Sequence, residues 1–223
     1  DQVKLIKYDY AKASLLGTNG DYMDTYSNTG RSGTNQGKNL TTEIGVYYWN
    51  NNTENNTWSE SNLNVINLNT NFINNIGSDW IQKISLHSWI VGGNTWENVG
   101  NSSVTTSYKN EITSPAEETI YQSKIGLMYV SDYGYSALPS AWTTILNNFS
   151  ENDNTSWMYM GLYEWSLTPR SDGTNNVLAL QVSKDFYFNY VLLQFAVRPV
   201  FYLISDTVYS GGNGTALTPY LIK

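Results

Sequence analysis

Hydrophobic residues recur at helical spacing in one part of the chain, between Trp58 and Ile84. The apolar residues there follow one another at three- and four-residue steps: Leu63, Ile66, Phe72, Ile73, Ile76, Trp80, Ile81 and Ile84. Because residues three and four apart share one face of an α-helix, this spacing predicts one or two amphipathic helices. Gly77 interrupts the run and is expected to separate two short helices.

The remainder of the chain has the pattern of short β-strands. Residues 3–10 have high β propensity and are expected to form a strand that pairs with the C-terminal strand. The nearly continuous apolar run at 124–131 predicts a central strand that is buried on both faces. Further strands are predicted at 86–91, 157–167, 177–182, 187–195 and 197–204, and residues 215–222 are expected to form a closing edge strand.

The order of these elements indicates the fold class. Helices precede most of the strands instead of alternating with them, which favours an α+β domain with an antiparallel sheet and two or more short helices. A third helix is predicted at 139–146, where Pro139 occupies the first turn, and the polar stretch 17–42 predicts a long loop. We expect one domain that spans residues 1–223.

Composition narrows the classes of partner. Charged residues make up only 14% of the chain, and its formal net charge is −7. An acidic surface without a basic stripe repels phosphate backbones, so we expect no nucleic acid partner. The chain contains no cysteine and no run of about 18 apolar residues, so we expect neither a disulfide nor a membrane span. These features are typical of an exported domain, located outside the cell or at its surface.

Few residues offer chemistry for catalysis. His87 is the single histidine, which rules out the common triads and zinc sets, and it is interpreted as a hydrogen-bonded structural residue. Asp132, Asp153, Glu164 and Asp172 could supply the acid and base of a glycosidase, or oxygen ligands for calcium, but nothing in their spacing supports either function. We therefore predict no enzyme activity, no cofactor and no metal.

Two segments resemble a known family. Residues 160–166, Met-Gly-Leu-Tyr-Glu-Trp-Ser, resemble the Asn-Val-x-Glu-Trp strand of formylglycine-generating-enzyme-like domains, and 196–203 resemble their closing Gly-Phe-Arg-Val strand. Those domains are a branch of the C-type lectin-like fold, and the stretch 124–165 is similar to uncharacterised extracellular domains of low-GC Gram-positive bacteria. The resemblance implies that Glu164 and Arg198 are structural. The cysteine pair and the histidine cluster of the family's enzymes are both missing here.

The segment 186–195 is the predicted contact surface. It carries large apolar side chains at consecutive positions, and a half-buried strand hides only every second one, so several are expected to lie exposed. Similar C-type lectin-like proteins are diversified by retroelements that mutate adenines in this part of the chain. The resemblance therefore implies a variable ligand-binding site over residues 178–195, for which the predicted contact residues are Leu178, Phe186, Phe188, Asn189, Tyr190, Leu192 and Leu193.

These observations give a functional hypothesis with two alternatives. The chain is predicted to be the variable protein of a diversity-generating retroelement, which binds a protein or glycan on another cell or on a phage surface. The first alternative is a fixed adhesin or a structural subunit of a pilus or cell surface. The second is a carbohydrate-binding lectin, because Trp and Tyr rings stack well on sugars.

Overall fold

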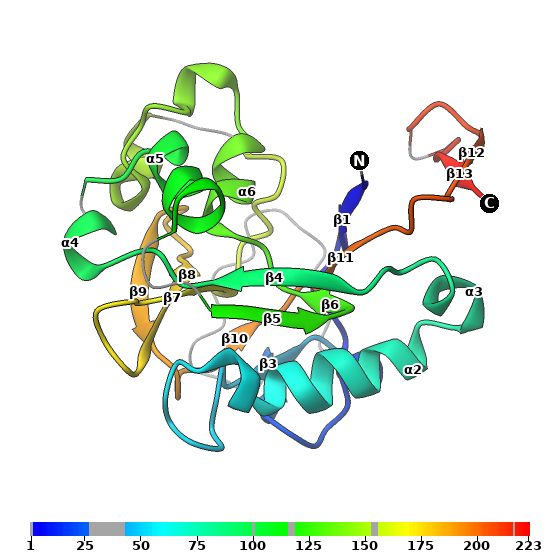
Figure 1. Ribbon diagram of the computed structural model, residues 1–223, viewed down its shortest axis with the longest axis horizontal. Coiled ribbons are helices and arrows are strands. Elements are labelled where there is room, and N and C mark those ends of the chain that lie inside the picture. Colours follow the sequence, from blue (N-terminus) through cyan, green and yellow to red (C-terminus); the bar gives the residue numbers. More distant parts are fainter. Residues whose placement is uncertain (1, 27–42, 100, 116–118, 153–155, 216) are drawn as a thin grey trace.

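The structure is a computed structural model, and it describes residues 2–26, 43–99, 101–115, 119–152, 156–215 and 217–223. It combines several β-sheets with short helices in a mixed α+β arrangement (Figure 1), which confirms the predicted class. The predicted loop at 17–42 lies largely outside the described residues. Its described part contains a short strand at 22–25, followed by residue 26.

The largest sheet has six strands in the order β2-β3-β10-β7-β8-β9. These strands are β2 (Tyr22–Thr25), β3 (Gly45–Tyr47), β7 (Glu164–Pro169), β8 (Asn176–Leu180), β9 (Phe186–Tyr190) and β10 (Phe195–Ala196). Neighbouring strands are antiparallel except for β10 and β7, which run parallel. The sheet is therefore mixed but mostly antiparallel, and the sequence predicted an antiparallel sheet. Strand β9 forms one edge of it.

Three smaller sheets complete the β structure. A three-stranded sheet has the order β1-β11-β6, and the other two are the pairs β4-β5 and β12-β13. The strands are β1 (Lys4–Ile6), β4 (His87–Val91), β5 (Thr119–Ser123), β6 (Ile125–Gly126), β11 (Val200–Tyr202), β12 (Tyr209–Gly211) and β13 (Leu221–Ile222). The N-terminal strand pairs with β11 and not, as predicted, with the C-terminal strand, which is β13 and pairs with β12.

The helices are short. They are α1 (Ala13–Leu16), η2 (Trp58–Glu60), η3 (Leu63–Phe72), α2 (Ile73–Asn75), α3 (Ser78–Ile81), α4 (Trp96–Val99), α5 (Val104–Tyr108), η4 (Lys109–Thr113), α6 (Val130–Tyr135), η5 (Pro139–Ala141) and η6 (Leu146–Asn152). The helical prediction between Trp58 and Ile84 is confirmed, and Gly77, at a φ of 96°, separates α2 from α3. Among the described residues, no helix is long and apolar enough to cross a membrane.

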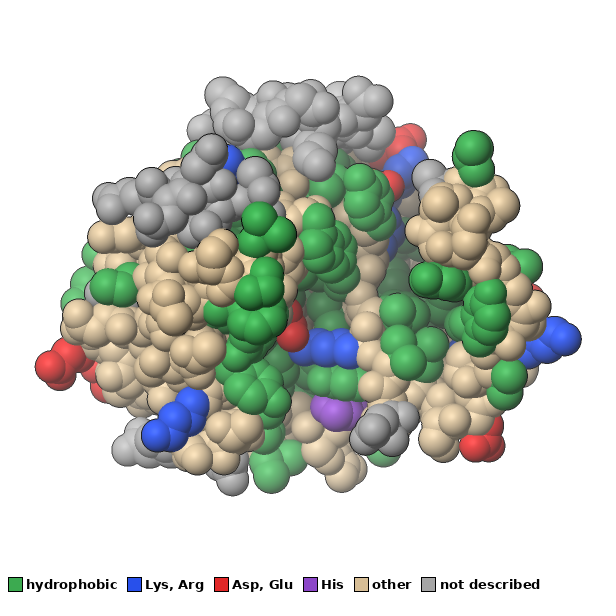
Figure 2. Space-filling view, turned by 90° about the horizontal axis from the view of Figure 1, so that it is seen from above, with side chains coloured by type: hydrophobic (Ala, Val, Ile, Leu, Met, Phe, Trp, Pro, Cys, Tyr) green, Lys and Arg blue, Asp and Glu red, His purple; other side chains and the backbone are tan. Residues whose placement is uncertain are grey.

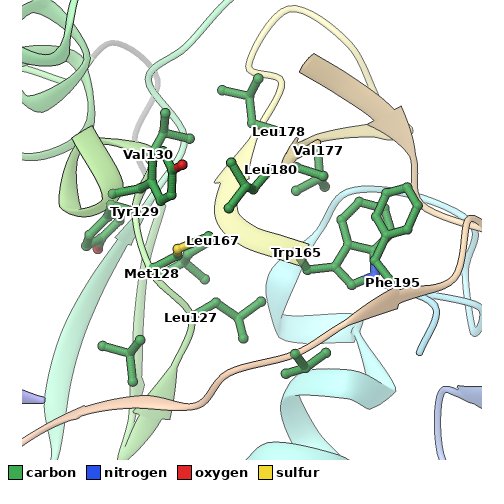
Figure 3. Packing of buried hydrophobic residues seen from close by; sticks show 14 of the residues in the cluster. Leu127, Met128, Tyr129, Val130, Trp165, Leu167, Val177, Leu178, Leu180 and Phe195 are labelled. Atoms are coloured by element: carbon green, nitrogen blue, oxygen red, sulfur yellow. The ribbon is translucent and has the colours of Figure 1, made fainter. Parts of the chain in front are cut away.

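Buried aromatic and aliphatic side chains from the sheets and helices form one large core cluster. Figure 3 shows part of it, where Leu178 and Leu180 of β8 lie among the side chains that also include Trp165 and Phe195. The rings of Trp165 and Phe195 are 4.5 Å apart, and the Trp165 indole N–H donates a 2.8 Å hydrogen bond to the Tyr47 carbonyl. Without disulfides, the fold depends on this packing and on buried hydrogen bonds.

The run at 124–131 is buried as predicted, but it is not one long strand. Only Ile125–Gly126 pairs in a sheet, and α6 begins at Val130. The amides of Val130 and Ser131 donate to the buried carboxylate of Glu111 at 3.2 and 3.1 Å. A carboxylate stabilises the N-terminus of a helix, and the sequence pattern could not show one that comes from about twenty residues upstream.

Two other predicted elements differ from the structure. The helix expected at 139–146 is replaced by the single 3-10 turn of η5 and the separate segment η6. The expected closing strand at 215–222 is limited to Leu221–Ile222, which pairs with β12 and not with the main sheets. Three neighbouring glycines at 211, 212 and 214 have positive φ angles, so the chain turns between β12 and β13.

Candidate functional site

Strand β9 alternates between buried and exposed side chains. Phe186 and Phe188 are 0% and 5% exposed, whereas Tyr187 between them is 48% exposed. Leu178, the partner of Phe188 across the β8–β9 ladder, is buried as well. The expectation that Leu178, Phe186 and Phe188 lie on the surface is therefore wrong. The two-residue period of a strand sends all three into the core.

The other predicted contact residues lie near the surface to different degrees. Tyr190 is 36% exposed and Asn189 is half-buried. Leu192 and Leu193 are partly buried and pack against the main core. Their role as ligand contacts stays a prediction.

An exposed aromatic pair joins β9 to the short helix α4. The rings of Trp96 and Tyr187 meet edge to face at a centroid distance of 5.4 Å. The ring of buried Phe188 lies nearly parallel to the Trp96 ring at 5.8 Å and supports it from the core. Nevertheless, Trp96 is 45% exposed, so the pair presents a large aromatic surface at the edge of the sheet.

Asp172 holds this aromatic pair in place. Its carboxylate accepts hydrogen bonds from the Trp96 amide at 3.0 Å and from Arg170 Nε and Nη2 at 2.7 and 3.3 Å. The Arg170 guanidinium in turn lies 5.1 Å from the Trp96 ring centroid. The hydrogen bond from Arg170 lowers the pKa of the Asp172 carboxyl, so the pair is charged and formed at neutral pH. Asp172 therefore links the Trp96 backbone to Arg170 in the turn after β7.

A small polar pocket adjoins the aromatic pair and shares Arg170 with it. Its volume is about 170 Å³, and its lining residues are Asn56, Thr57, Trp58, Ser59, Val91, Gly92, Thr119, Tyr121, Pro169, Arg170, Ser171 and Gly173. At roughly 30 Å³ per water, it holds about five or six water molecules. That is too small to enclose a whole ligand of drug size, for which pockets of about 300 Å³ or more are usual. We call this pocket, with Trp96 and Tyr187, the Arg170 site.

Amide side chains build the pocket wall. Asn56 Nδ2 lies at hydrogen-bonding distance from the carbonyls of Arg170, Gly173 and Asn176, at 2.8, 2.9 and 3.0 Å, which fixes the turn between β7 and β8. Trp58 also lines the pocket, and its side chain is 2% exposed. Within the described part of the chain, the Trp58 indole Nε1 has no hydrogen-bond partner. A buried donor without a partner lowers the stability of the fold.

The described carboxylates that were considered for catalysis each form an ion pair with a different basic side chain. Asp153 lies outside the described residues. The other three, Asp132, Glu164 and Asp172, form ion pairs with Lys4, Arg198 and Arg170 respectively. Glu164 and Arg198 are 0% and 1% exposed and share two hydrogen bonds of 2.7 Å, in agreement with the structural role that the resemblance implied.

His87 lies against aromatic rings on β4. Its ring stacks on Tyr202 at 3.7 Å and meets Trp89 edge to face at 5.0 Å. Burial lowers the pKa of the imidazole, and the nearby Lys4 ammonium lowers it further, so the ring is neutral at pH 7. Among the described residues, no group of three or more His, Asp or Glu side chains gathers as a metal site.

No family model matches this chain, and no curated protein or solved structure matches it either. The function must therefore be argued from the geometry of the sites.

Sequence reasoning missed most of the Arg170 site. It named the segment 178–195, which contains Tyr187, but not Trp96, Arg170 or Trp58. These residues are far apart in the sequence, and the contact between α4 and β9 depends on the fold. One available signal was Arg170-Ser-Asp172-Gly173 after a predicted strand, because Asp and Gly mark a turn that ends a strand.

Proposed function

We propose that the protein is a non-enzymatic binding protein, outside the cell or at its surface, that recognises a neutral glycan at the Arg170 site. One observation carries this proposal: two half-exposed aromatic rings, Trp96 and Tyr187, lie beside a polar pocket that Arg170 lines. Of the alternatives considered from the sequence, this geometry favours the lectin.

The charges of the site favour a neutral ligand. Asp172 compensates Arg170, so the site carries no net charge from this pair. The guanidinium keeps further N–H groups that are not bonded to Asp172, and the pocket adds the hydroxyls of Thr57, Ser59 and Thr119. A sugar offers C–H faces for the aromatic rings and hydroxyls for these polar groups. One sugar unit would enter the pocket while its neighbour contacts Tyr187.

A glycan array followed by titration calorimetry tests the proposal. The wild-type protein should bind one class of neutral oligosaccharide, and Tyr187→Ala should weaken that binding about fivefold, because an aromatic contact of this kind is worth roughly 1 kcal/mol. Tyr8→Ala is the matched control, since Tyr8 is 63% exposed and does not line the Arg170 site. Absence of any glycan binding, or equal binding by the wild type and Tyr187→Ala, would rule the proposal out.

A variable protein surface is the second candidate. It is supported by the exposure of Tyr187 and Tyr190 along an edge strand. Diversification at Phe186 would cost several kcal/mol of stability, because the side chain is fully buried. We therefore expect any adenine-directed variation to be confined to 187, 189, 190, 192 and 193. Sequencing of codons 170–205 in sibling isolates tests this candidate, and an invariant segment would exclude it.

Membership of the C-type lectin-like fold is also a proposal. Two features support it: the N-terminal strand pairs with a strand close to the C-terminus, and Glu164 bonds to Arg198 between the two segments that carry the resemblance. An experimental structure that could be superposed on a formylglycine-generating-enzyme-like domain would test it directly.

A further inference from the structure

Strand β1 has an open edge. In the sheet order β1-β11-β6 it has a neighbour on one side only. The carbonyl of Val3 and the amide of Lys7 form hydrogen bonds of 2.9 and 3.0 Å with residues that flank β11. Because backbone groups alternate in direction along a strand, those of Lys4 and Ile6 point away from β11, toward the open edge. The described residues supply no strand on that side.

Cavities lie on both faces of the sheet beside this edge. A cavity of about 350 Å³ is lined by Val200, and a second one of about 380 Å³ is lined by Phe201. Successive residues of a strand point to opposite faces, so these two cavities lie on opposite sides of the sheet. Leu5 and Ile6 line both of them. A strand added to β1 would therefore direct its alternate side chains into the two cavities.

The first cavity contains a compensated charge. Lys4 Nζ lies 2.5 Å from an oxygen of Asp132, and its ammonium is 4.5 Å from the ring centroid of Tyr129, 5.6 Å from that of Tyr202 and 5.9 Å from that of Trp89. Cation–π contacts and the carboxylate satisfy this ammonium. The rest of the lining is apolar and includes Met128, Trp157 and Met158. An incoming side chain here needs no charge of its own.

The second cavity is lined by a charged residue, Lys7, that forms no ion pair among the described residues, although the charge of Asp9 acts on it. Its lining is Leu15, Phe72, Ile76, Trp80 and Phe201 together with Asn75 and the β1 residues. Lys7 is the one charged side chain among the described residues that line it. Lys7 Nζ donates to the backbone carbonyl of Asp9 at 3.2 Å. A carboxylate brought to this end would gain an ion pair. Large apolar side chains suit the rest of the cavity.

The space around β1 continues along the surface of the molecule as a hollow. Figure 2 shows a hollow that runs along the middle of this face, with hydrophobic side chains on both of its walls. A third cavity, of about 650 Å³, extends the hollow between β1 and the β12–β13 pair and is lined by Val3, Tyr209 and Tyr220. An extended segment that follows β1 would lie in this hollow, between its two walls.

We propose that the β1 edge binds an extended polypeptide segment of another protein by antiparallel or parallel strand addition, with alternating large apolar residues and an acidic residue beside Lys7. Only a polypeptide supplies alternating N–H and C=O groups that match those of Lys4 and Ile6. This site is separate from the Arg170 site, so the proposal goes beyond the function proposed above.

A displayed library of unstructured peptides of about twelve residues, which extend to roughly 40 Å, supplies the probe. The wild-type protein should enrich peptides with alternating apolar residues and one Asp or Glu. The affinity of the best peptide is then measured by fluorescence polarisation against Ile6→Pro and Ile6→Ala. Proline removes the outward N–H, which is tolerated on an edge strand, and alanine controls for the lost side chain. We expect Ile6→Pro to bind about tenfold more weakly than Ile6→Ala.

N-methylation of the peptide provides a second measurement that requires no protein variant. Alternate amides of the bound peptide would point toward β1 and away from it. Methylation of every second amide should therefore abolish binding when the methylated N–H groups face β1 and leave it nearly unchanged when they face away. Lys7→Glu should reverse the preference for an acidic residue. The proposal is overturned if no peptide is enriched, if both registers of N-methylation act alike, or if the protein forms a dimer that Ile6→Pro dissociates.

Discussion

Substitutions at Phe186 and Tyr187 should separate folding from binding, although the two residues are neighbours. Phe186 is fully buried, and its ring meets that of Tyr133 edge to face at 5.3 Å. Replacing a buried Phe by Ala costs about 3–5 kcal/mol, and the aromatic contact places the expected loss for Phe186→Ala in the upper half of that range. Tyr187→Ala removes a half-exposed ring that contacts mainly Trp96, so its cost should be about 1 kcal/mol or less.

Urea unfolding followed by tryptophan fluorescence measures both free energies. Phe188→Ala serves as a control, because Phe188 lies on the same face of β9 as Phe186 and should also cost several kcal/mol. Glycan binding should show the opposite pattern, with the larger loss for Tyr187→Ala. If Phe186→Ala costs less than about 1 kcal/mol, or Tyr187→Ala costs more than Phe186→Ala, the assignment of the two faces of β9 is incorrect.

Three further predictions concern buried groups. Glu164→Gln should lower the free energy of unfolding by about 3–5 kcal/mol, because it leaves the buried Arg198 charge unpaired, and a loss below about 1 kcal/mol in urea titration would contradict that. Burial raises the pKa of Glu111 from 4.5 to about 6. The contribution of this group to the free energy of unfolding is therefore fully present below pH 4.5 and is lost as the pH rises through 6, a change of about 2 kcal/mol. Unfolding titrations between about pH 4 and 7 should show this change in the wild type but not in Glu111→Gln. Gly93→Ala should cost more than about 1 kcal/mol in thermal unfolding, because Gly93 has a φ of 94° and its added Cβ would lie 1.9 Å from the Asn110 carbonyl oxygen; an unchanged melting temperature would show that the backbone there adjusts freely.

The sequence predicted helices and strands correctly where one hydrophobic period, helical or strand-like, continued over a long segment. The helical spacing between Trp58 and Ile84 gave the helices and the break at Gly77 correctly. The segment 186–195 misled because consecutive large residues obscured the period of two. Some large residues of this segment were expected to lie exposed, but the pattern did not show which. In the structure Tyr187 points outward against Trp96, whereas Phe186 and Phe188 are buried.

The run at 124–131 shows a different limit of sequence reasoning. Its uniform burial was predicted, but burial does not distinguish a strand from a helix in a short apolar segment. Two carboxylates, those of Glu111 and Asp132, favour the helix here, because they accept hydrogen bonds from the backbone N–H groups at the start of α6. Glu111 occupies a segment that carried no signal for this role, so only the tertiary structure reveals it.

The Arg170 site was not predictable for a related reason. Asn56 reaches the turn after β7 across more than a hundred residues, and Asp172 connects that turn to Trp96. Asn and Asp are common in loops, where most of them bond locally. Neither residue type nor spacing distinguishes Asn56 from the other asparagines around it.

The interactions that hold the Arg170 site together determine how ligand affinity should depend on salt. Neutral amide hydrogen bonds from Asn56 fix the turn, and the Arg170–Asp172 ion pair adjusts the position of Trp96. Salt screens exposed ion pairs strongly but leaves neutral hydrogen bonds almost unaffected. If the amides hold the site, ligand affinity should change little between low and high ionic strength, whereas a site that depends on Arg170 as a charge would weaken steeply. The salt dependence of binding therefore distinguishes a neutral glycan from an anionic ligand at the same residues.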